Sequence, residues 1–397
     1  MPQHLTGFGN LSGVTTTTTI MSKLPHIGTS IFTVMSQMAN EHQAINLSQG
    51  FPNFPVDERL TAITAKLAYE NVHQYTPMAG HSGLLDKITR LTLASYNRNL
   101  NPVTDMVVTA GATEAIFATI QALVNKNEEV IILDPSYDCY EAPILLSNAL
   151  PVRVALNDDY TPNWEAIASQ MSVKTRMLII NNPHNPTGKI WSEADFIQLE
   201  KLLELYPDVI LLSDEVYEYI TYEQHHISVN TRIKLRDKSV IISSFGKSLH
   251  ITGWKIGYAI APEYLMREIK KVHQFLVFSV NSLSQAAISE YLDVVDFNEI
   301  AIMYRQKRDY FRELMAQTPF ELLPCEGSYF QVASYASFSK QSDVEFSKEL
   351  ITRYGVATIP ISTFYANGKD LKLVRFCFAK DNNTLEQATL RLQKITF

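Results

Sequence analysis

The sequence predicts an α/β protein with two parts, a large domain built on a mostly parallel seven-stranded sheet flanked by helices and a smaller α+β domain. Short apolar runs rich in β-branched residues alternate with helical periodicity over residues 58–290, which is the pattern of an open, doubly wound sheet. The runs are apolar throughout, as in strands buried on both faces. Hydrophobic residues make up 46% of the 397 residues, enough for a large core.

The elements follow from this periodicity in chain order. Strands of the large domain are predicted at residues 106–109, 130–133, 152–156, 177–181, 209–214, 240–244 and 256–261. Helices between them are predicted at 114–124, 193–205 and 262–272. One long helical stretch, 282–317, leads into the small domain, which has strands at 328–332, 356–360 and 373–378 and helices at 343–354 and 384–394.

Composition shifts along the chain predict the domain boundaries. Residues 1–22 contain three glycines and a run of five threonines with almost no charge, which is typical of a flexible tail or a cloning remnant. An N-terminal segment at 23–57 is expected to pack with the small domain. The large domain is then predicted at 58–290 and the small domain at 291–397.

Charge and cysteine content exclude several classes of function. The chain has 41 acidic and 34 basic residues and a net charge of −7, so it has no bulk attraction for nucleic acid or an anionic membrane. No apolar run approaches the ~20 residues of a spanning helix. Cys139, Cys325 and Cys377 are far apart and have no zinc spacing. We therefore expect a reduced, cytoplasmic enzyme that needs no metal.

Polar side chains directly follow three of the predicted strands. Ligands of an open parallel sheet bind beyond the carboxyl ends of its strands, so these side chains should gather at one edge. Taken singly, each has a common structural explanation: Asp214 would cap a helix, Lys247 would be a solvated charge and Asn185 would form a turn. Together an acid, a lysine, a phenol and an amide indicate a binding site. Its candidate residues are Asn185, Asp214, Tyr217, Ser244 and Lys247.

Small residues follow the first predicted strand, where a helix begins. Gly111, Ala112 and Thr113 would let backbone amides approach an anion, which the helix dipole favours. Tight packing of the helix on the strand explains these small residues about as well as an anion site does. The nearby cation Lys255 favours the anion site. A reactive lysine, a buried acid and an anion cradle suit pyridoxal 5'-phosphate, which needs a covalently bound lysine, a carboxylate for its ring nitrogen and a phosphate pocket.

Six motifs run in order along the chain from about residue 23 to the C-terminus. They are Asn-Leu-Ser-Gln-Gly-Phe-Pro at 46–52, Asn-Pro-Thr-Gly at 185–188, Ser-Asp-Glu-Val-Tyr at 213–217, Ser-Phe-Gly-Lys at 244–247, Thr-Gly-Trp-Lys-Ile-Gly-Tyr at 252–258 and Val-Arg-Phe-Cys-Phe at 374–378. With these motifs the chain resembles the class I, fold type I pyridoxal-phosphate aminotransferases. It looks most like the methionine aminotransferases and the kynurenine aminotransferase/glutamine transaminase K group. The resemblance implies transfer of an amino group from an amino acid to a 2-oxo acid in two half-reactions.

The resemblance also implies a role for each cofactor-binding position. Lys247 would bond to the cofactor and move a proton between the substrate Cα and the cofactor C4′, and Asp214 would pair with the ring nitrogen. Asn185 and Tyr217 would hydrogen-bond the phenolic oxygen. Tyr137 would stack on the ring, although a core aromatic is the other interpretation. The phosphate would be held by Gly111, Ala112, Thr113, Ser244 and Lys255.

Substrate contacts and the partner subunit enter by the same resemblance. Tyr75 matches a tyrosine that reaches the phosphate from the partner subunit, so a homodimer is the expected working unit. Arg375 lies in an otherwise apolar strand, and its guanidinium suits a bidentate carboxylate. An internal salt bridge is the alternative, but here the substrate α-carboxylate is favoured. Gly50, Asn185 and Phe32 complete the predicted substrate site.

The side-chain pocket is predicted to take an uncharged substrate. Aspartate-type relatives bind a side-chain carboxylate with a second arginine, but this chain has no lysine or arginine between residues 272 and 304. Phe275, Val277, Phe278 and Ser279 stand there instead. A pocket with aromatic walls and no cation favours methionine, whose thioether packs well on rings, followed by aromatic amino acids, glutamine, histidine and kynurenine. Kynurenine is the doubtful member, because kynurenine-type enzymes often carry a histidine where Ser279 stands.

Other functions remain open on the sequence. The same Cα carbanion can expel a β leaving group, so a cysteine-S-conjugate β-lyase is the nearest rival, and a kynurenine or glutamine transaminase is a further one. A non-catalytic module of this fold is a rival from a different class. Lys247, Asp214 and Arg375 are all present, which argues against a dead enzyme.

Overall fold

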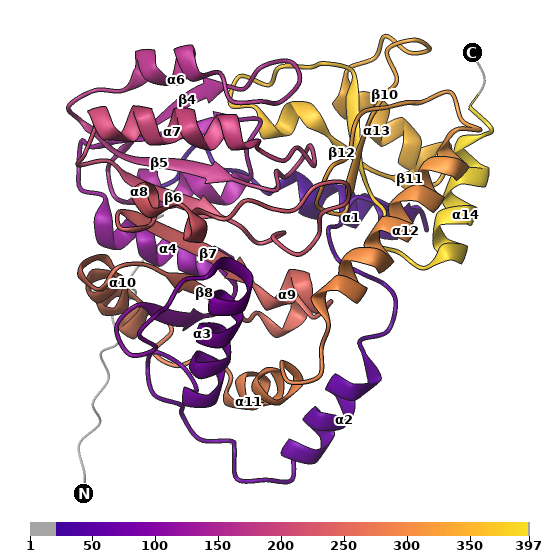
Figure 1. The fold of residues 1–397 in the computed structure, drawn as a ribbon. Coiled ribbons are helices and arrows are strands. Elements are labelled where there is room, and N and C mark those ends of the chain that lie inside the picture. Colours follow the sequence, from indigo (N-terminus) through magenta and orange to yellow (C-terminus); the bar gives the residue numbers. More distant parts are fainter. Residues whose placement is uncertain (1–20, 396–397) are drawn as a thin grey trace, which may run out of the picture.

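The computed structural model describes residues 21–395. The tail predicted at 1–22 therefore lies almost wholly outside the described residues. The described chain folds around a seven-stranded sheet, a four-stranded sheet and a separate two-stranded pair (Figure 1). No helix of this described part is long and apolar enough to cross a membrane.

The large sheet has seven strands in the order β2-β8-β7-β6-β5-β3-β4. All neighbours are parallel except β8, which runs antiparallel to both β2 and β7. The predicted mostly parallel sheet of seven strands is confirmed. The strands are β2 (Met106–Thr109), β3 (Glu129–Asp134), β4 (Leu150–Ala155), β5 (Thr175–Asn181), β6 (Ile210–Asp214), β7 (Ser239–Ser244) and β8 (Gly257–Ile260).

Helices cover both faces of this sheet because successive side chains of each strand point to opposite sides. Val130 and Ile132 of β3 pack into one core with α4, α5 and α10, whereas Ile131 and Leu133 pack into the other core with α3, α6, α7 and α11. The helices are α3 (Ser82–Tyr96), α4 (Ala112–Leu123), α5 (Glu141–Leu146), α6 (Trp164–Gln170), α7 (Glu193–Leu205), α8 (Ile233–Arg236), α9 (Phe245–Ser248), α10 (Glu263–Leu276) and α11 (Ser282–Tyr291).

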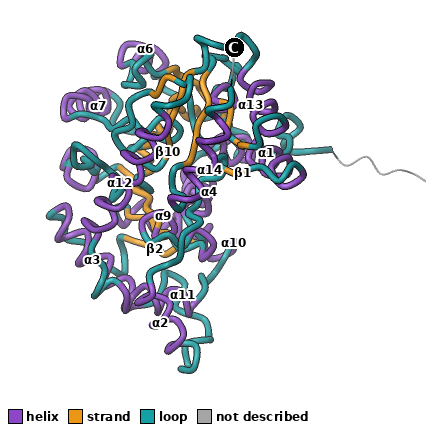
Figure 2. The backbone as a smooth tube through the Cα atoms, turned by 90° about the vertical axis from the view of Figure 1, so that its right-hand side faces the viewer, coloured by secondary structure: helices purple, strands orange, loops and turns teal. Residues whose placement is uncertain are grey.

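The C-terminal part has its own four-stranded sheet, in the order β12-β13-β10-β9 with antiparallel neighbours. The N-terminal strand β1 (Ile45–Asn46) pairs with β11 (Val356–Ala357), so the first part of the chain lies among these late elements (Figures 1 and 2). The remaining elements are α1 (Ile31–Glu41), α2 (Glu58–Leu67), α12 (Phe297–Met315), β9 (Glu321–Leu322), β10 (Phe330–Ser334), α13 (Asp343–Thr352), β12 (Ile359–Pro360), β13 (Leu373–Cys377) and α14 (Asn382–Leu392). The domain boundaries at 58 and 291 stay a proposal.

Two predicted elements are wrong in the same way, because each is divided. The helical stretch 282–317 breaks between α11 and α12, where the side chain of Asp296 accepts a hydrogen bond from the backbone N–H of Asn298 and starts a new helix. The strand predicted at 356–360 is two short strands, because β11 pairs with β1 whereas β12 pairs with β13.

Candidate active site

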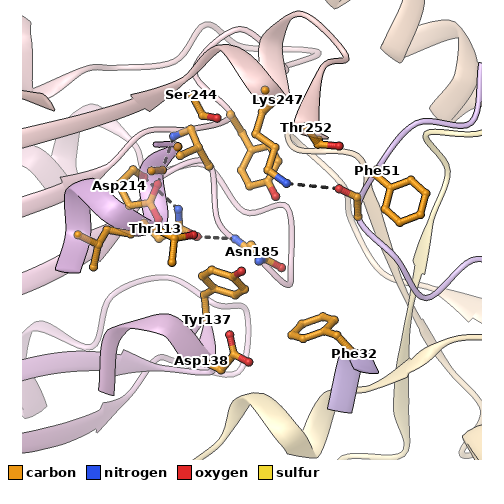
Figure 3. Close-up of a pocket in the computed structure, with 18 of the residues that line it drawn as sticks. Phe32, Phe51, Thr113, Tyr137, Asp138, Asn185, Asp214, Ser244, Lys247 and Thr252 are labelled. Atoms are coloured by element: carbon orange, nitrogen blue, oxygen red, sulfur yellow. Dashed lines mark hydrogen bonds between the residues drawn. The ribbon is translucent and has the colours of Figure 1, made fainter. Parts of the chain in front are cut away.

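A cavity of about 390 Å³ opens at the carboxyl ends of the central strands (Figure 3). The large sheet, the N-terminal segment and the C-terminal sheet all contribute side chains to it. Every predicted site residue lines this cavity except Tyr75. The lining is Ser30, Phe32, Gln49, Gly50, Phe51, Gly111, Ala112, Thr113, Ile116, Tyr137, Asp138, Asn181, Asn185, Asp214, Val216, Tyr217, Ser244, Gly246, Lys247, Thr252, Lys255, Phe330 and Arg375.

Lys247 lies on the short helix α9, which directly follows the central strand β7. Ser244, the last residue of β7, pairs with Gly257, the first residue of β8. Lys247 therefore lies just beyond the carboxyl end of β7. Its Nζ donates a hydrogen bond to the carbonyl oxygen of Gly50 at 3.3 Å. Burial, helped by the nearby cations Arg375 and Lys255, lowers the pKa of Lys247 to about 8. The amine is therefore partly neutral near physiological pH.

Asp214 ends strand β6 and is buried at the floor of the cavity. Its Oδ2 accepts a hydrogen bond from the hydroxyl of Tyr140 at 2.7 Å, and its Oδ1 accepts one from the backbone N–H of Val216 at 3.3 Å. Burial raises its pKa to about 6, while these two donors and the positive charge of Lys247 oppose the rise. An acid held in this way needs a cationic partner in the cavity to stay fully ionised.

The N-terminus of α4 forms an open cradle beside Lys255. Gly111 precedes the helix with φ +77° and no side-chain cap, so the first helical N–H groups face the cavity. A Cβ on Gly111 would lie 3.2 Å from Nζ of Lys255, which shows how closely the cation approaches. A Cβ on Gly257 would lie 2.9 Å from the backbone nitrogen of Ala112. Glycine is needed at both positions for the loops to meet.

Arg375, on strand β13, is almost wholly buried yet has no carboxylate partner in the described chain. One guanidinium nitrogen donates to Oδ1 of Asn185 at 2.7 Å and the other to the carbonyl oxygen of Ser48 at 3.1 Å. Its Nε is buried without a hydrogen-bond partner. The alternative of an internal salt bridge is therefore wrong. An unpaired buried guanidinium is suited to binding an anion that enters from outside.

Aromatic rings form the remaining walls. Tyr217 is buried and packs edge-on against Tyr329 and Phe330, at centroid distances of 5.3 and 5.9 Å. Tyr137 and Phe32 meet edge-to-face at 6.3 Å on the other side. Figure 3 shows the ring of Tyr137 below Asn185 and the ring of Phe32 to its lower right.

Tyr75 is the predicted site residue that the fold places elsewhere. Its side chain is 82% exposed and contacts the ring of Phe278 edge-on at 5.4 Å. It therefore does not belong to the cavity of its own chain.

Sequence reasoning missed several residues in or beside the cavity, and three of them carry polar groups of interest. Tyr140 and Tyr329 act through hydroxyl groups, on Asp214 and on the carbonyl of Gly50 respectively, the second at 2.6 Å. Both residues look like core aromatics in the sequence. The third is Asp138, a carboxylate in the cavity wall, which follows Tyr137 and carried no signal of its own.

The fold and the cavity together define a fold type I transferase: an open sheet whose strand ends carry a lysine, an acid and an anion cradle. Comparison with known proteins identifies the family. A family model described as "Aminotransferase class I and II" matches residues 42–392. The chain belongs to this family and is an aminotransferase, which acts on amino acids and 2-oxo acids.

Individual relatives agree with this assignment over nearly the whole chain. The methionine aminotransferase of Escherichia coli (strain K12) is 43% identical over 378 residues, which cover 94% of this chain and 98% of the relative. The kynurenine–oxoglutarate transaminase of Dictyostelium discoideum is 32% identical, with 93% and 94% covered. A solved structure of an E. coli protein identified as having a methionine aminotransferase function superposes with a TM-score of 0.92 at 43% identity, covering 95% of this chain and all of that one.

Proposed function

We propose that this aminotransferase moves the amino group of methionine, or of another neutral or aromatic amino acid, to a 2-oxo acid with pyridoxal 5'-phosphate as cofactor, in a ping-pong order. The observation that carries the proposal is the placement of Lys247, Asp214 and Arg375 around one cavity. The relative that is 43% identical and named for methionine supports the choice of donor.

The residues of the cavity fit this cofactor. The free N–H groups of α4 and the cation Lys255 suit its phosphate, and Ser244 lies beside them in the lining. Asp214, with its raised pKa, suits a protonated ring nitrogen, which would keep the carboxylate ionised. When bound, the cofactor supplies an aldehyde that takes up the amino group and a ring that withdraws electrons from the substrate Cα.

The chain's own residues then have separate tasks. Lys247 would anchor the cofactor and would move a proton between the substrate Cα and the cofactor C4′. Its lowered pKa makes the neutral amine available for this work near pH 8. Asn185 and Tyr217 would hydrogen-bond the phenolic oxygen of the cofactor, and Tyr137 would stack on its ring. Arg375 binds the substrate α-carboxylate through the guanidinium edge that Nε leaves free.

The aromatic wall supports a neutral substrate side chain. Phe32, Phe51 and Phe330 line the cavity and offer no positive charge to a second carboxylate. Methionine packs well on such rings. Kynurenine is a second candidate donor, because the relative that is 32% identical is named for it.

The test combines one substitution with a substrate panel. Lys247→Ala is expected to lose the yellow colour of the bound cofactor and at least a thousandfold in turnover, whereas Lys201→Ala, an exposed lysine of α7, should change neither. Wild-type kcat/KM should be higher for methionine than for aspartate. Full activity of Lys247→Ala would overturn the mechanism, and a preference for aspartate would overturn the substrate assignment. Pyruvate and ammonia from a cysteine conjugate without any acceptor would indicate the β-lyase instead.

A homodimer in the cytoplasm is part of the same proposal. Tyr75 would reach the phosphate of the partner subunit, which agrees with its exposure outside its own cavity. Other large apolar side chains are also exposed and suit a subunit interface, namely Tyr69, Phe275, Leu276 and Phe278, of which Phe278 contacts the Tyr75 ring. The three cysteines are free thiols, as expected for a reducing compartment.

A further inference from the structure

Asp138 places a carboxylate in the wall of the cavity. It is the first residue of the short helix after strand β3, next to Tyr137, and Figure 3 shows it on the side of the cavity where Phe32 lies. The side chain is exposed to the cavity rather than packed in the core.

No other acid of this loop is free in this way. Arg153 forms ion pairs with both Asp134, at 2.7 Å, and Glu141, which stand on either side of Asp138 in the sequence. Within residues 21–395, no basic side chain pairs with Asp138 and no side chain donates a hydrogen bond to it. Burial raises its pKa, and the charge of Arg375 opposes that rise by favouring the carboxylate. The acid thus lines the cavity without a side-chain hydrogen bond or an ion pair among the described residues, and Arg375 is the cation whose charge acts on it.

The proposed function assigns every other charge of the cavity. The charged lining residues are Asp138, Asp214, Lys247, Lys255 and Arg375. In that proposal Lys247 holds the cofactor and Lys255 faces its phosphate. Asp214 pairs with its ring nitrogen, and Arg375 binds the substrate α-carboxylate. Asp138 alone has no task. It lies with Tyr137 and Phe32, on the wall that the substrate side chain would meet.

We propose that Asp138 is a specificity-determining residue that excludes substrates with a second carboxylate from both half-reactions. This inference rests on the proposed function and deepens it. A side-chain carboxylate would meet a like charge in a partly desolvated cavity, where repulsion is much stronger than in water. A thioether, an aromatic ring or an amide pays no such penalty.

The amine acceptor is then also a monocarboxylate. Donor and acceptor occupy the same site in turn, so a charge that rejects glutamate and aspartate also rejects 2-oxoglutarate and oxaloacetate. The enzyme would exchange amino groups between neutral amino acids and neutral 2-oxo acids. The name of the kynurenine–oxoglutarate relative would suggest 2-oxoglutarate as acceptor, and the charge of Asp138 argues against carrying that acceptor over to this chain.

The test is Asp138→Asn in the holoenzyme, which removes the charge and keeps the shape. The ratio of kcat/KM for glutamate to that for methionine should rise by about tenfold or more, and so should the ratio for 2-oxoglutarate to 2-oxo-4-methylthiobutanoate. An equilibrium readout uses carboxylates that cannot react. Glutarate should bind at least about tenfold more tightly to the variant, measured through the absorbance of the bound cofactor, while the affinity for 4-(methylthio)butanoate stays the same.

Three further variants keep the result unambiguous. Asp138→Glu retains the charge and should retain the discrimination. Asp158→Asn removes one negative charge from a fully exposed position and should leave both ratios unchanged. If Asp138→Asn loses the cofactor, Asp138→Ala takes its place with the same expectation. Unchanged ratios and an unchanged glutarate affinity would overturn the inference while leaving the proposed function intact. A wild-type enzyme that holds the cofactor but transaminates no neutral amino acid would instead overturn the proposed function.

Discussion

The hydroxyl of Tyr140 controls how strongly Asp214 can hold a positive charge. The 2.7 Å hydrogen bond to Oδ2 stabilises the carboxylate and opposes the effect of burial, which raises the pKa of the acid to about 6. Because Tyr140 does not itself line the cavity, it is a positioning residue that acts through Asp214. Its contribution should therefore appear in the pH dependence of the reaction.

We predict that Tyr140→Phe moves the acid limb of the kcat/KM profile to higher pH by about one unit. The carboxylate loses a donor, its pKa rises, and the protonated form persists to a higher pH, so activity is lost earlier as the pH falls. A charged hydrogen bond of this kind contributes about 1.5–3 kcal/mol. Tyr335→Phe, which removes a buried hydroxyl bonded to the carbonyl of Gln341, is the matched control and should leave the profile in place. An unshifted acid limb in Tyr140→Phe would show that the bond is only structural.

At the scale of elements, the N-terminus of α4 depends on a backbone conformation that only glycine adopts easily. Gly111 has φ +77°, and an added Cβ would press on Lys255. Gly253, in the loop after Lys247, has open space around its Cβ position and no such φ. An added Cβ should therefore be tolerated at Gly253 but not at Gly111, so alanine substitutions at the two positions can be compared.

We predict that Gly111→Ala weakens binding of pyridoxal 5'-phosphate by about tenfold or more and lowers stability by about 1 kcal/mol, whereas Gly253→Ala changes neither. Fluorescence titration of the apoprotein and urea unfolding would measure the two effects. Equal cofactor affinities in the two variants would contradict the role of α4 as the phosphate cradle.

The elements that sequence could predict are those with strong periodicity. The strands of the large sheet are buried on both faces and read as apolar runs, so β2 was predicted to the residue and the others to within a few positions. The break near Asp296 and the pairing of β1 with β11 could not be predicted in this way, because one depends on a single capping carboxylate and the other joins segments about 310 residues apart.

Some residues of the site can likewise be predicted from the sequence and others cannot. Lys247 and Asp214 can be predicted because they follow apolar strands that end at one edge of the sheet, and Arg375 can be predicted because its charge lies inside an apolar strand. Tyr140 and Tyr329 cannot, because a buried tyrosine whose hydroxyl matters cannot be told from one that only fills space. Their partners are 74 and 279 residues away in the chain. Tertiary structure alone brings these groups together.

At the scale of the whole molecule, we predict that two subunits share each active site. If Tyr75 completes the site of the partner subunit, a dimer of a Tyr75→Ala subunit with a Lys247→Ala subunit contains one site with both natural residues. Each variant alone should be impaired. After unfolding and refolding as an equimolar mixture, activity should return to about a quarter of the wild-type value per total protein, because half of the dimers are mixed and each has one intact site.

Kinetics after refolding would measure the recovery. A mixture that stays as inactive as its parents would contradict the shared site. Separately, Phe275→Asp is expected to shift the protein towards monomer in sedimentation velocity, because that side chain is 87% exposed and lies three residues before Phe278, which contacts Tyr75. Val173→Asp, which is exposed near the far end of the large sheet, is the matched control and should stay dimeric.

The lone carboxylate of Asp138 also has a pharmacological consequence. A competitive inhibitor of this enzyme should pair an acid group for Arg375 with a weakly basic tail, such as a pyridine, directed at Asp138. Aspartate-type aminotransferases have a second arginine at the position that the tail would occupy. The positive charge of that arginine would repel the basic tail. Selectivity between the two kinds of enzyme would then come from the sign of one charge.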